Sequence, residues 1–231
     1  MTEITMDRRI IHRLLMESFF MQNPGLLRGQ MGIVLALAEF YGKTRSNKLY
    51  RDFWSELLDV LFEHVDEQSP IGFCDGLCGI GWGLEYLIQH RFVDGSGKDV
   101  CMEINKKMMQ ENIRNIEDLT LDNGLEGRLH YILAHIQGCK RQEKSIPFNT
   151  DYLYDVYQSV YKLHETQTSE TLKQLSENYI LYYQTGCLAE YHFSLRHFVR
   201  LQKTDNWDIL QAPLGLCDGL AGMLLLQEKK L

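Results

Sequence analysis

The sequence predicts an all-α protein built from about five helical hairpins that form a partial or small ring. The composition is rich in leucine, glutamate, glutamine and methionine and includes only 4 prolines, which favours helices over strands. A glycine motif recurs at a nearly constant period, and the segments between its copies carry apolar residues at helical spacing. The 231 residues require no second core, so we expect a single domain over 1–231.

The glycine motif is Gly-x-x-Gly at the start of an apolar segment. Its first glycine occurs four times, at Gly29, Gly76, Gly124 and Gly219. Successive copies are 47, 48 and 95 residues apart, so the last interval spans two periods and lacks one motif. Two copies extend into a longer near-repeat, which reads GFCDGLCG at 72–79 and GLCDGLAG at 215–222. The period predicts about five units in the chain.

Each unit is expected to contain an outer amphipathic helix followed by a buried inner helix. Apolar residues over 53–65 recur three and four positions apart, as on a helix with one buried face. After the motif, 33–38 is an unbroken apolar run, and 80–88 is interrupted only by two glycines and Glu85. Such helices are buried on nearly all sides. A ring provides this burial, because outer helices cover one side and a narrow lumen lies on the other.

The fourth unit lacks the glycine motif, so its helices are predicted from apolar spacing alone. We expect an outer helix over 152–163 and an inner helix over 171–183. The segment 188–201 is then expected to form the last outer helix.

Two glycines in the first turn of a helix cost roughly 1 kcal/mol each relative to alanine, so they need a structural reason. Close approach of neighbouring helix ends is one, and first-turn N–H groups left open to a ligand are another. Asp75, Asn123 and Asp218 each precede a first glycine and are expected to cap the helix. The carboxylates of Asp75 and Asp218 could also face a cavity or a metal ion.

Charge and composition exclude several classes of partner. The net charge is −7, and no basic cluster with interleaved aromatic residues occurs, which argues against nucleic acid. The chain has no apolar run that could span a bilayer and no signal-peptide pattern, so we expect a cytoplasmic protein without a membrane partner. In that compartment the six cysteines are thiols or metal ligands rather than disulfides.

With four motifs in register, the sequence resembles the lanthionine synthetase C-like proteins. The resemblance covers essentially the whole chain and implies an α/α toroid in which Gly-x-x-Gly turns introduce the inner helices. It also implies a role in modifying a ribosomally made peptide. The cyclases of this family hold a zinc ion that binds a precursor cysteine as thiolate, and the thiolate adds to a dehydroamino acid to close a thioether ring.

Residue by residue, the resemblance places Cys74 and Cys217 at two zinc ligands, and Asp218 where the family has a histidine ligand. Together they could hold Zn²⁺ with one position open. The third inner helix carries His130 and His135, and His130 is the candidate catalytic acid, with a satisfied core histidine as the alternative. The protein is then either a zinc-dependent cyclase or a degenerate relative that only binds the peptide.

The partners that the resemblance implies are a precursor peptide or another modification enzyme. Because the family ring has seven units, a homodimer could complete a shorter ring here. Two other functions stay open, a carbohydrate-active α/α barrel with Asp75 and Asp218 as paired lumen carboxylates, and a scaffold without chemistry. Glu85 is expected to be solvated or to act as a cap.

Overall fold

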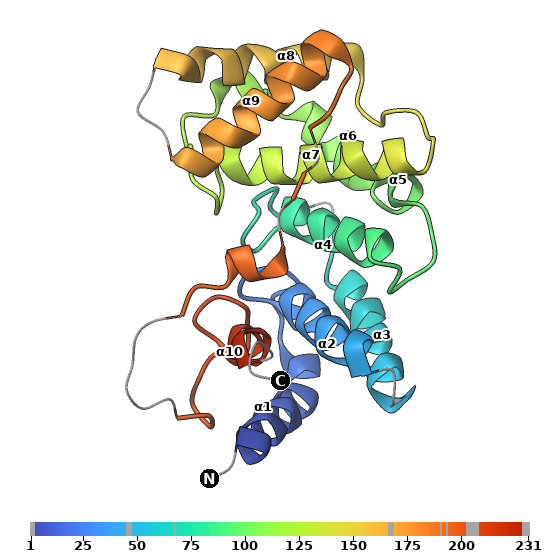
Figure 1. The fold of residues 1–231 in the computed structure, drawn as a ribbon, viewed down its shortest axis with the longest axis vertical. Helices are drawn as coiled ribbons and strands as arrows, with labels where there is room; N and C mark the ends of the chain where they lie inside the picture. Colours follow the sequence, from blue (N-terminus) through green and yellow to red (C-terminus); the bar gives the residue numbers. More distant parts are fainter. Residues whose placement is uncertain are drawn as a thin grey trace. The chain divides into compact units, whose positions relative to one another are not determined.

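The protein is helical in the part of the chain that the structure, a computed structural model, describes (Figure 1). The described residues are 3–44, 48–66, 68–165, 169–189, 191–192, 194–201 and 208–227. Every regular element in these residues is an α-helix or a 3₁₀ helix, which confirms the all-α class. The chain divides into two compact units, a first unit of Met1–Ser69 with Phe193–Leu231 and a second unit of Pro70–His192.

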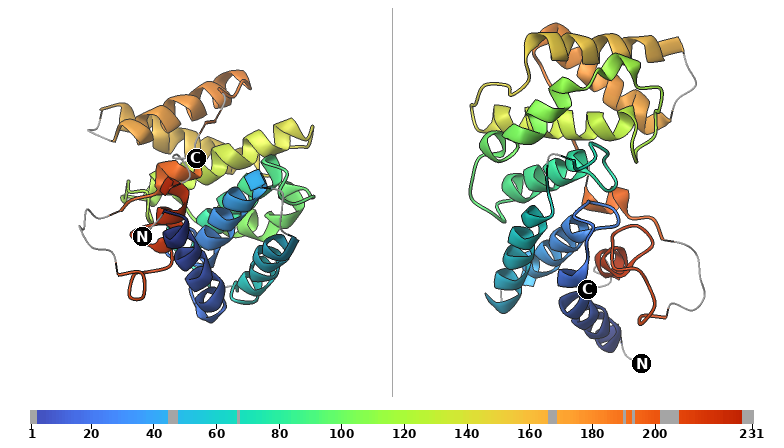
Figure 2. Two further views of the ribbon diagram at one scale, coloured as in Figure 1. Left: turned by 60° about the horizontal axis from the view of Figure 1, so that its bottom comes forward. Right: turned by 180° about the vertical axis from the view of Figure 1, so that it is seen from behind.

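The first unit combines both ends of the chain. Its helices are α1 (Glu3–Glu17), η1 (Ser18–Phe20), α2 (Gln30–Thr44), α3 (Lys48–Glu63), η4 (Leu195–Phe198) and α10 (Leu220–Gln227). Helix α2 packs against α3 and α10, and α10 also packs against α1. Figure 2 shows α1 and α10 side by side, at the blue and red ends of the colour scale. The two terminal segments therefore share one core.

The second unit is continuous in sequence and centres on α7. Its helices are α4 (Leu77–Gln89), α5 (Gly97–Val100), α6 (Met102–Gln110), η2 (Ile113–Asn115), α7 (Leu125–Arg141), α8 (Thr150–Tyr161), η3 (Lys162–Glu165) and α9 (Glu170–Thr185). Helix α7 packs against α4 and α9, and α8 covers α9. Side-chain caps begin two of these α-helices, because Asn149 accepts from the N–H of Tyr152 and Ser169 from that of Leu172.

The predicted contrast between buried and amphipathic helices holds for the helices that follow a glycine motif. Helices α2, α4, α7 and α10 are buried over most of their described length, whereas α3 and α8 each have an exposed face. Helix α9 was expected to be an inner helix, but it is amphipathic and leaves Leu181 42% exposed. The sequence repeat without the glycine motif therefore lacks a helix that is buried on all sides.

The expected outer helix over 188–201 is wrong. In the described part of this segment only η4 is helical, and residues 190 and 193 lie outside the described residues. Leu195 and Phe198 are both buried and stand three positions apart, which matches helical spacing, but a single 3₁₀ turn is enough to bury them. The backbone becomes extended at Val199.

The four glycine motifs form the same backbone turn. In each, the N–H of the residue after the first glycine donates to a carbonyl oxygen seven residues earlier, in the pairs Gln30–Asn23 (2.9 Å), Leu77–Pro70 (2.8 Å), Leu125–Asp118 (2.9 Å) and Leu220–Pro213 (2.9 Å). A Cβ on Gly76 would lie 2.7 Å from the carbonyl oxygen of Gly72, and one on Gly219 would lie 2.7 Å from the nitrogen of Gly215. Glycine is required because the loop backbone occupies the side-chain position.

This turn corrects two expectations about the helix starts. The N-caps of α4 and α7 are Gly76 and Gly124, not Asp75 and Asn123, and no side chain takes part in either cap. The first-turn N–H groups expected to be open to a ligand already donate to loop carbonyls, at Leu77 and its counterparts. The glycine turn therefore provides an acceptor for the first N–H group of each of these helices.

Within each unit, two glycine turns dock on each other in the same way. In the second unit, the N–H of Cys74 donates to the carbonyl oxygen of Asp122 at 3.1 Å. In the first unit, the N–H of Cys217 donates to the carbonyl oxygen of Leu27 at 2.8 Å. All four residues stand two positions before the first glycine of their motif. The second turn thus docks on the third as the last turn docks on the first.

The substitution Gly127→Ala tests this packing. A Cβ there would lie 2.5 Å from the Cβ of Phe73 and would overlap the carbonyl oxygen of Leu121. We expect the free energy of unfolding in urea to fall by about 3 kcal/mol. Gly186→Ala is the control, since φ is +71° there and no heavy atom lies within 4 Å of a Cβ, and it should cost about 1 kcal/mol. Equal losses would contradict the packing argument.

Candidate metal centre

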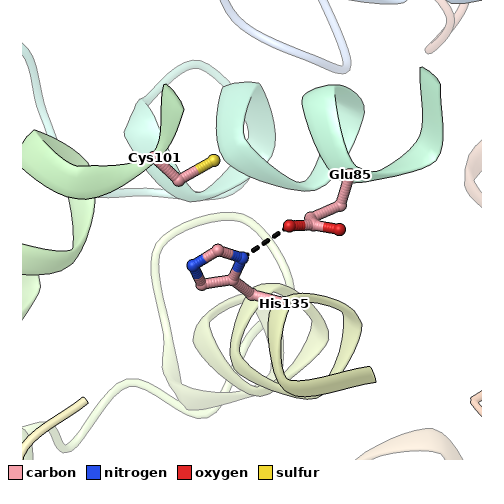
Figure 3. A group of neighbouring side chains, drawn as sticks. All are labelled: Glu85, Cys101 and His135. Atoms are coloured by element: carbon pink, nitrogen blue, oxygen red, sulfur yellow. Dashed lines mark hydrogen bonds and ion pairs between the residues drawn. The ribbon is translucent and has the colours of Figure 1, made fainter. Parts of the chain in front are cut away.

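Three side chains from separate elements of the second unit meet in its core (Figure 3). Glu85 comes from α4, Cys101 from the junction of α5 and α6, and His135 from α7. Their oxygen, sulfur and nitrogen atoms all lie within 4.8 Å of one another. Glu85 is 1% exposed, and Cys101 and His135 are 0% exposed. This group could hold a metal ion, and we call it the candidate metal centre.

The carboxylate of Glu85 pairs with the imidazole of His135. Their Oε1 and Nδ1 atoms are 2.5 Å apart, the contact that Figure 3 marks with a dashed line. The other oxygen of Glu85 accepts from Nε2 of Gln89 at 3.0 Å, and the same nitrogen lies 3.0 Å from the carbonyl oxygen of Ala134. Both oxygens of this buried carboxylate are therefore satisfied.

The second ring nitrogen of His135 also has a partner. Its Nε2 lies 2.9 Å from Nδ2 of Asn105, and the hydroxyl of Tyr131 donates to Oδ1 of Asn105 at 2.6 Å. Since the amide oxygen faces Tyr131, the amide nitrogen donates to Nε2, and the neutral ring then carries its proton on Nδ1 toward Glu85. The Tyr131 ring stacks on His135 with centroids 5.4 Å apart.

Two glycines make room for the Glu85 carboxylate. A Cβ on Gly97 would overlap its Oε1, and a Cβ on Gly138 would overlap its Oε2. Gly138 lies on α7 and Gly97 begins α5, so backbone from two elements encloses the carboxylate. The position of Glu85 is therefore set by the surrounding chain as well as by its hydrogen bonds.

The buried thiols of Cys78 and Cys101 are unreactive at neutral pH. Burial raises the pKa of the Cys101 thiol well above its usual range, and the neighbouring Glu85 carboxylate raises it further. Burial likewise raises the pKa of Cys78 to about 12, and its sulfur lies 3.7 Å from that of Met108. At neutral pH both groups are protonated, and neither is an activated nucleophile.

The predicted catalytic residue His130 lies elsewhere in the core of the second unit. It is 0% exposed, and its Nδ1 is 2.7 Å from the hydroxyl oxygen of Tyr191, which also accepts from the indole N–H of Trp82 at 2.8 Å. The Phe73 ring centroid lies 5.5 Å from that of His130. An aromatic cluster therefore surrounds this histidine.

The three predicted zinc ligands are divided between the two compact units. Cys74, in the second unit, is 2% exposed. Cys217 and Asp218, in the first unit, are half-buried, and the N–H of Asp218 donates to the carbonyl oxygen of Arg200 at 2.7 Å. Asp75 and Asp218 are divided between the units in the same way. A zinc site at Cys74, Cys217 and Asp218, like the paired carboxylates of a glycosidase, stays a prediction.

Sequence reasoning missed the candidate metal centre. Glu85 was expected to be solvated or to cap a helix, and both expectations are wrong, because it is buried in the middle of α4. His135 is buried in the core, and its pairing with Glu85 was not predicted. One signal was available, since a lone charge in a helix buried on all sides must find a buried partner. Cys101 lies in a connection and offered no such signal.

The chain matches no protein-family model, no curated protein and no solved structure. Among the residues that the structure describes, none of the helices combines the length and the apolar character needed to cross a bilayer.

Thiol labelling tests the described burial. We expect the exposed Cys187 to react within minutes with an aromatic disulfide reagent at pH 8, whereas Cys78 and Cys101 should stay unmodified until urea is added. With a pKa of about 12, roughly one Cys78 in ten thousand is thiolate at that pH. Because the pKa is raised, labelling of Cys78 should speed up as the pH rises. Peptide mass spectrometry locates the label, and rapid native labelling of Cys101 would contradict the structure.

Proposed function

We propose that this chain is a lanthionine synthetase C-like α/α toroid protein that serves the modification of a ribosomally made peptide by binding the peptide, without closing its rings. The glycine turns support the fold part of this proposal. The last turn docks on the first through Cys217 and Leu27 as the second docks on the third through Cys74 and Asp122. Repeats that follow one another around a circle would have this relation between last and first.

The burial of the reactive groups carries the functional part. Lanthionine cyclisation requires a substrate thiol at the metal ion and a proton donor at the reacting atoms. The candidate metal centre is at most 1% exposed, and His130 is 0% exposed. A peptide on the surface of the second unit meets neither of them. For these groups, burial favours the peptide-binding version of the protein over the cyclase, whereas Cys217 and Asp218 are half-buried and a role for Cys74 and Cys217 in ring closure is decided by the experiment below.

Zinc is the ion that we assign to the candidate metal centre. A carboxylate, a thiol and an imidazole form a ligand set that suits Zn²⁺. Gln89 holds the outer oxygen of Glu85, as outer groups hold metal ligands elsewhere. Glu85, Cys101 and His135 would bind the ion, and a closed site of this kind supplies a cross-link between helices.

The six cysteines are thiols rather than disulfides, which agrees with a cytoplasmic location, a part of the same proposal.

Metal content tests the zinc assignment. Protein purified without chelator and without a histidine tag should contain about one zinc ion per chain by mass spectrometry of the metal. Cys101→Ala should lose it, whereas Cys78→Ala, which removes an equally buried thiol, should keep it. A chelator should lower the melting temperature of the wild type and of Cys78→Ala but not that of Cys101→Ala. Wild-type protein without stoichiometric metal would contradict the assignment.

Ring closure is tested with a synthetic peptide that contains one cysteine and one dehydroalanine. We expect the rate of thioether formation, followed by mass spectrometry, to be the same with and without the protein, because the buried groups do not reach the peptide. An acceleration that is lost in Cys74→Ala or Cys217→Ala would contradict the binding-only function and favour the cyclase.

A further inference from the structure

A hollow of about 510 Å³ lies in the first unit, between α1 and the segment that leads to the last glycine turn. Its walls are Arg8, Arg9, His12, Arg13, Met16 and Glu17 from α1, with Ile209 and Leu210 opposite. This site shares no residue with the candidate metal centre, which lies in the second unit.

Arg13 holds the two walls together. Its Nε lies 2.9 Å from Oε1 of Glu17, and its Nη1 donates to the carbonyl oxygen of Ile209. The side chain of Arg13 is only 13% exposed, and it links α1 to the backbone at Ile209. The one carboxylate of the hollow is thereby already paired.

The remaining charge of the hollow is positive. Arg8, Arg9 and His12 are exposed, and among the described ion pairs none involves Arg8 or Arg9. The whole chain carries a net charge of −7, so this cluster is opposite in sign to the protein as a whole. Such a local positive field attracts carboxylates, and the guanidinium group matches a carboxylate in shape.

Apolar side chains stand beside the positive ones. Met16 is 61% exposed and Leu210 is 71% exposed, while Ile209 is buried at the base. Exposed side chains of this size in a hollow lined by cations suit a ligand with both a carboxylate and an apolar group. A peptide segment with acidic and apolar side chains has this chemistry, whereas a nucleic acid has no apolar side chain to place there.

We propose that this hollow binds an acidic peptide segment, with carboxylates at Arg8, Arg9 and His12 and an apolar side chain against Met16 and Leu210. The inference rests on the proposed function, because it takes the ligand to be a peptide. It adds the place of binding and the kind of segment that is bound.

The test is fluorescence anisotropy with a short fluorescein-labelled peptide that alternates glutamate and leucine, at low salt. The same peptide with glutamine in place of glutamate is the second probe. The wild type should bind the acidic probe at least about tenfold more tightly, and the difference should shrink as salt is added. The double variant Arg8→Glu, Arg9→Glu should abolish this preference. It is expected to fold, because both side chains are exposed and substitutions at exposed positions change stability little.

The control variant Lys106→Glu, Lys173→Glu makes the same change in net charge at exposed positions of the second unit. It should bind the acidic probe as the wild type does. Equal loss in both double variants would overturn the proposal, because it would show a general effect of charge. Equal binding of the two probes, or no binding of either, would overturn it as well. These outcomes leave the zinc and ring-closure results, which decide the proposed function, unchanged.

Discussion

The fold depends on a hydrogen bond that spans seven residues, from the first N–H of a buried helix back to a carbonyl oxygen of its own entry loop, across a glycine. A buried helix start needs acceptors for its N–H groups, and here the backbone alone provides them. At α4 and α7 the residue before the glycine is therefore released from capping, and its type is not constant among the four copies, which have Arg28, Asp75, Asn123 and Asp218. The same turns also dock in pairs through backbone hydrogen bonds. One local arrangement therefore caps each buried helix and joins it to a second one.

Burial links the core to the proposed function. A carboxylate in the middle of α4 is tolerated because His135 and Gln89 satisfy both of its oxygens and two glycines make room for it. The network joins α4, α6 and α7, which suits a cross-linking role. It also removes these groups from contact with a peptide. In the first unit the exposed charges of Arg8 and Arg9 remain available at the surface. The groups that we propose to stabilise the fold and those that we propose to bind a peptide are thus found in different units.

The sequence predicts the features that are local. The turns and the buried helices that follow them were predictable, because each glycine packs against backbone only a few residues away. Without that motif, spacing alone misjudged 188–201 and the exposure of α9. The pairing of Glu85 with His135 joins residues 50 positions apart, and Cys101 approaches from a connection. Contacts between residues so far apart in the sequence depend on how the helices pack, which apolar periodicity does not specify.

The contact between Arg13 and Ile209 joins residues 196 positions apart, whereas the second unit is a single continuous stretch. During synthesis on the ribosome, the second unit can fold as soon as its last helix has emerged. Helices α1 and α2 must wait for α10 before their core is complete. Until α10 has been made, the apolar faces that it covers on these two helices stay accessible to solvent.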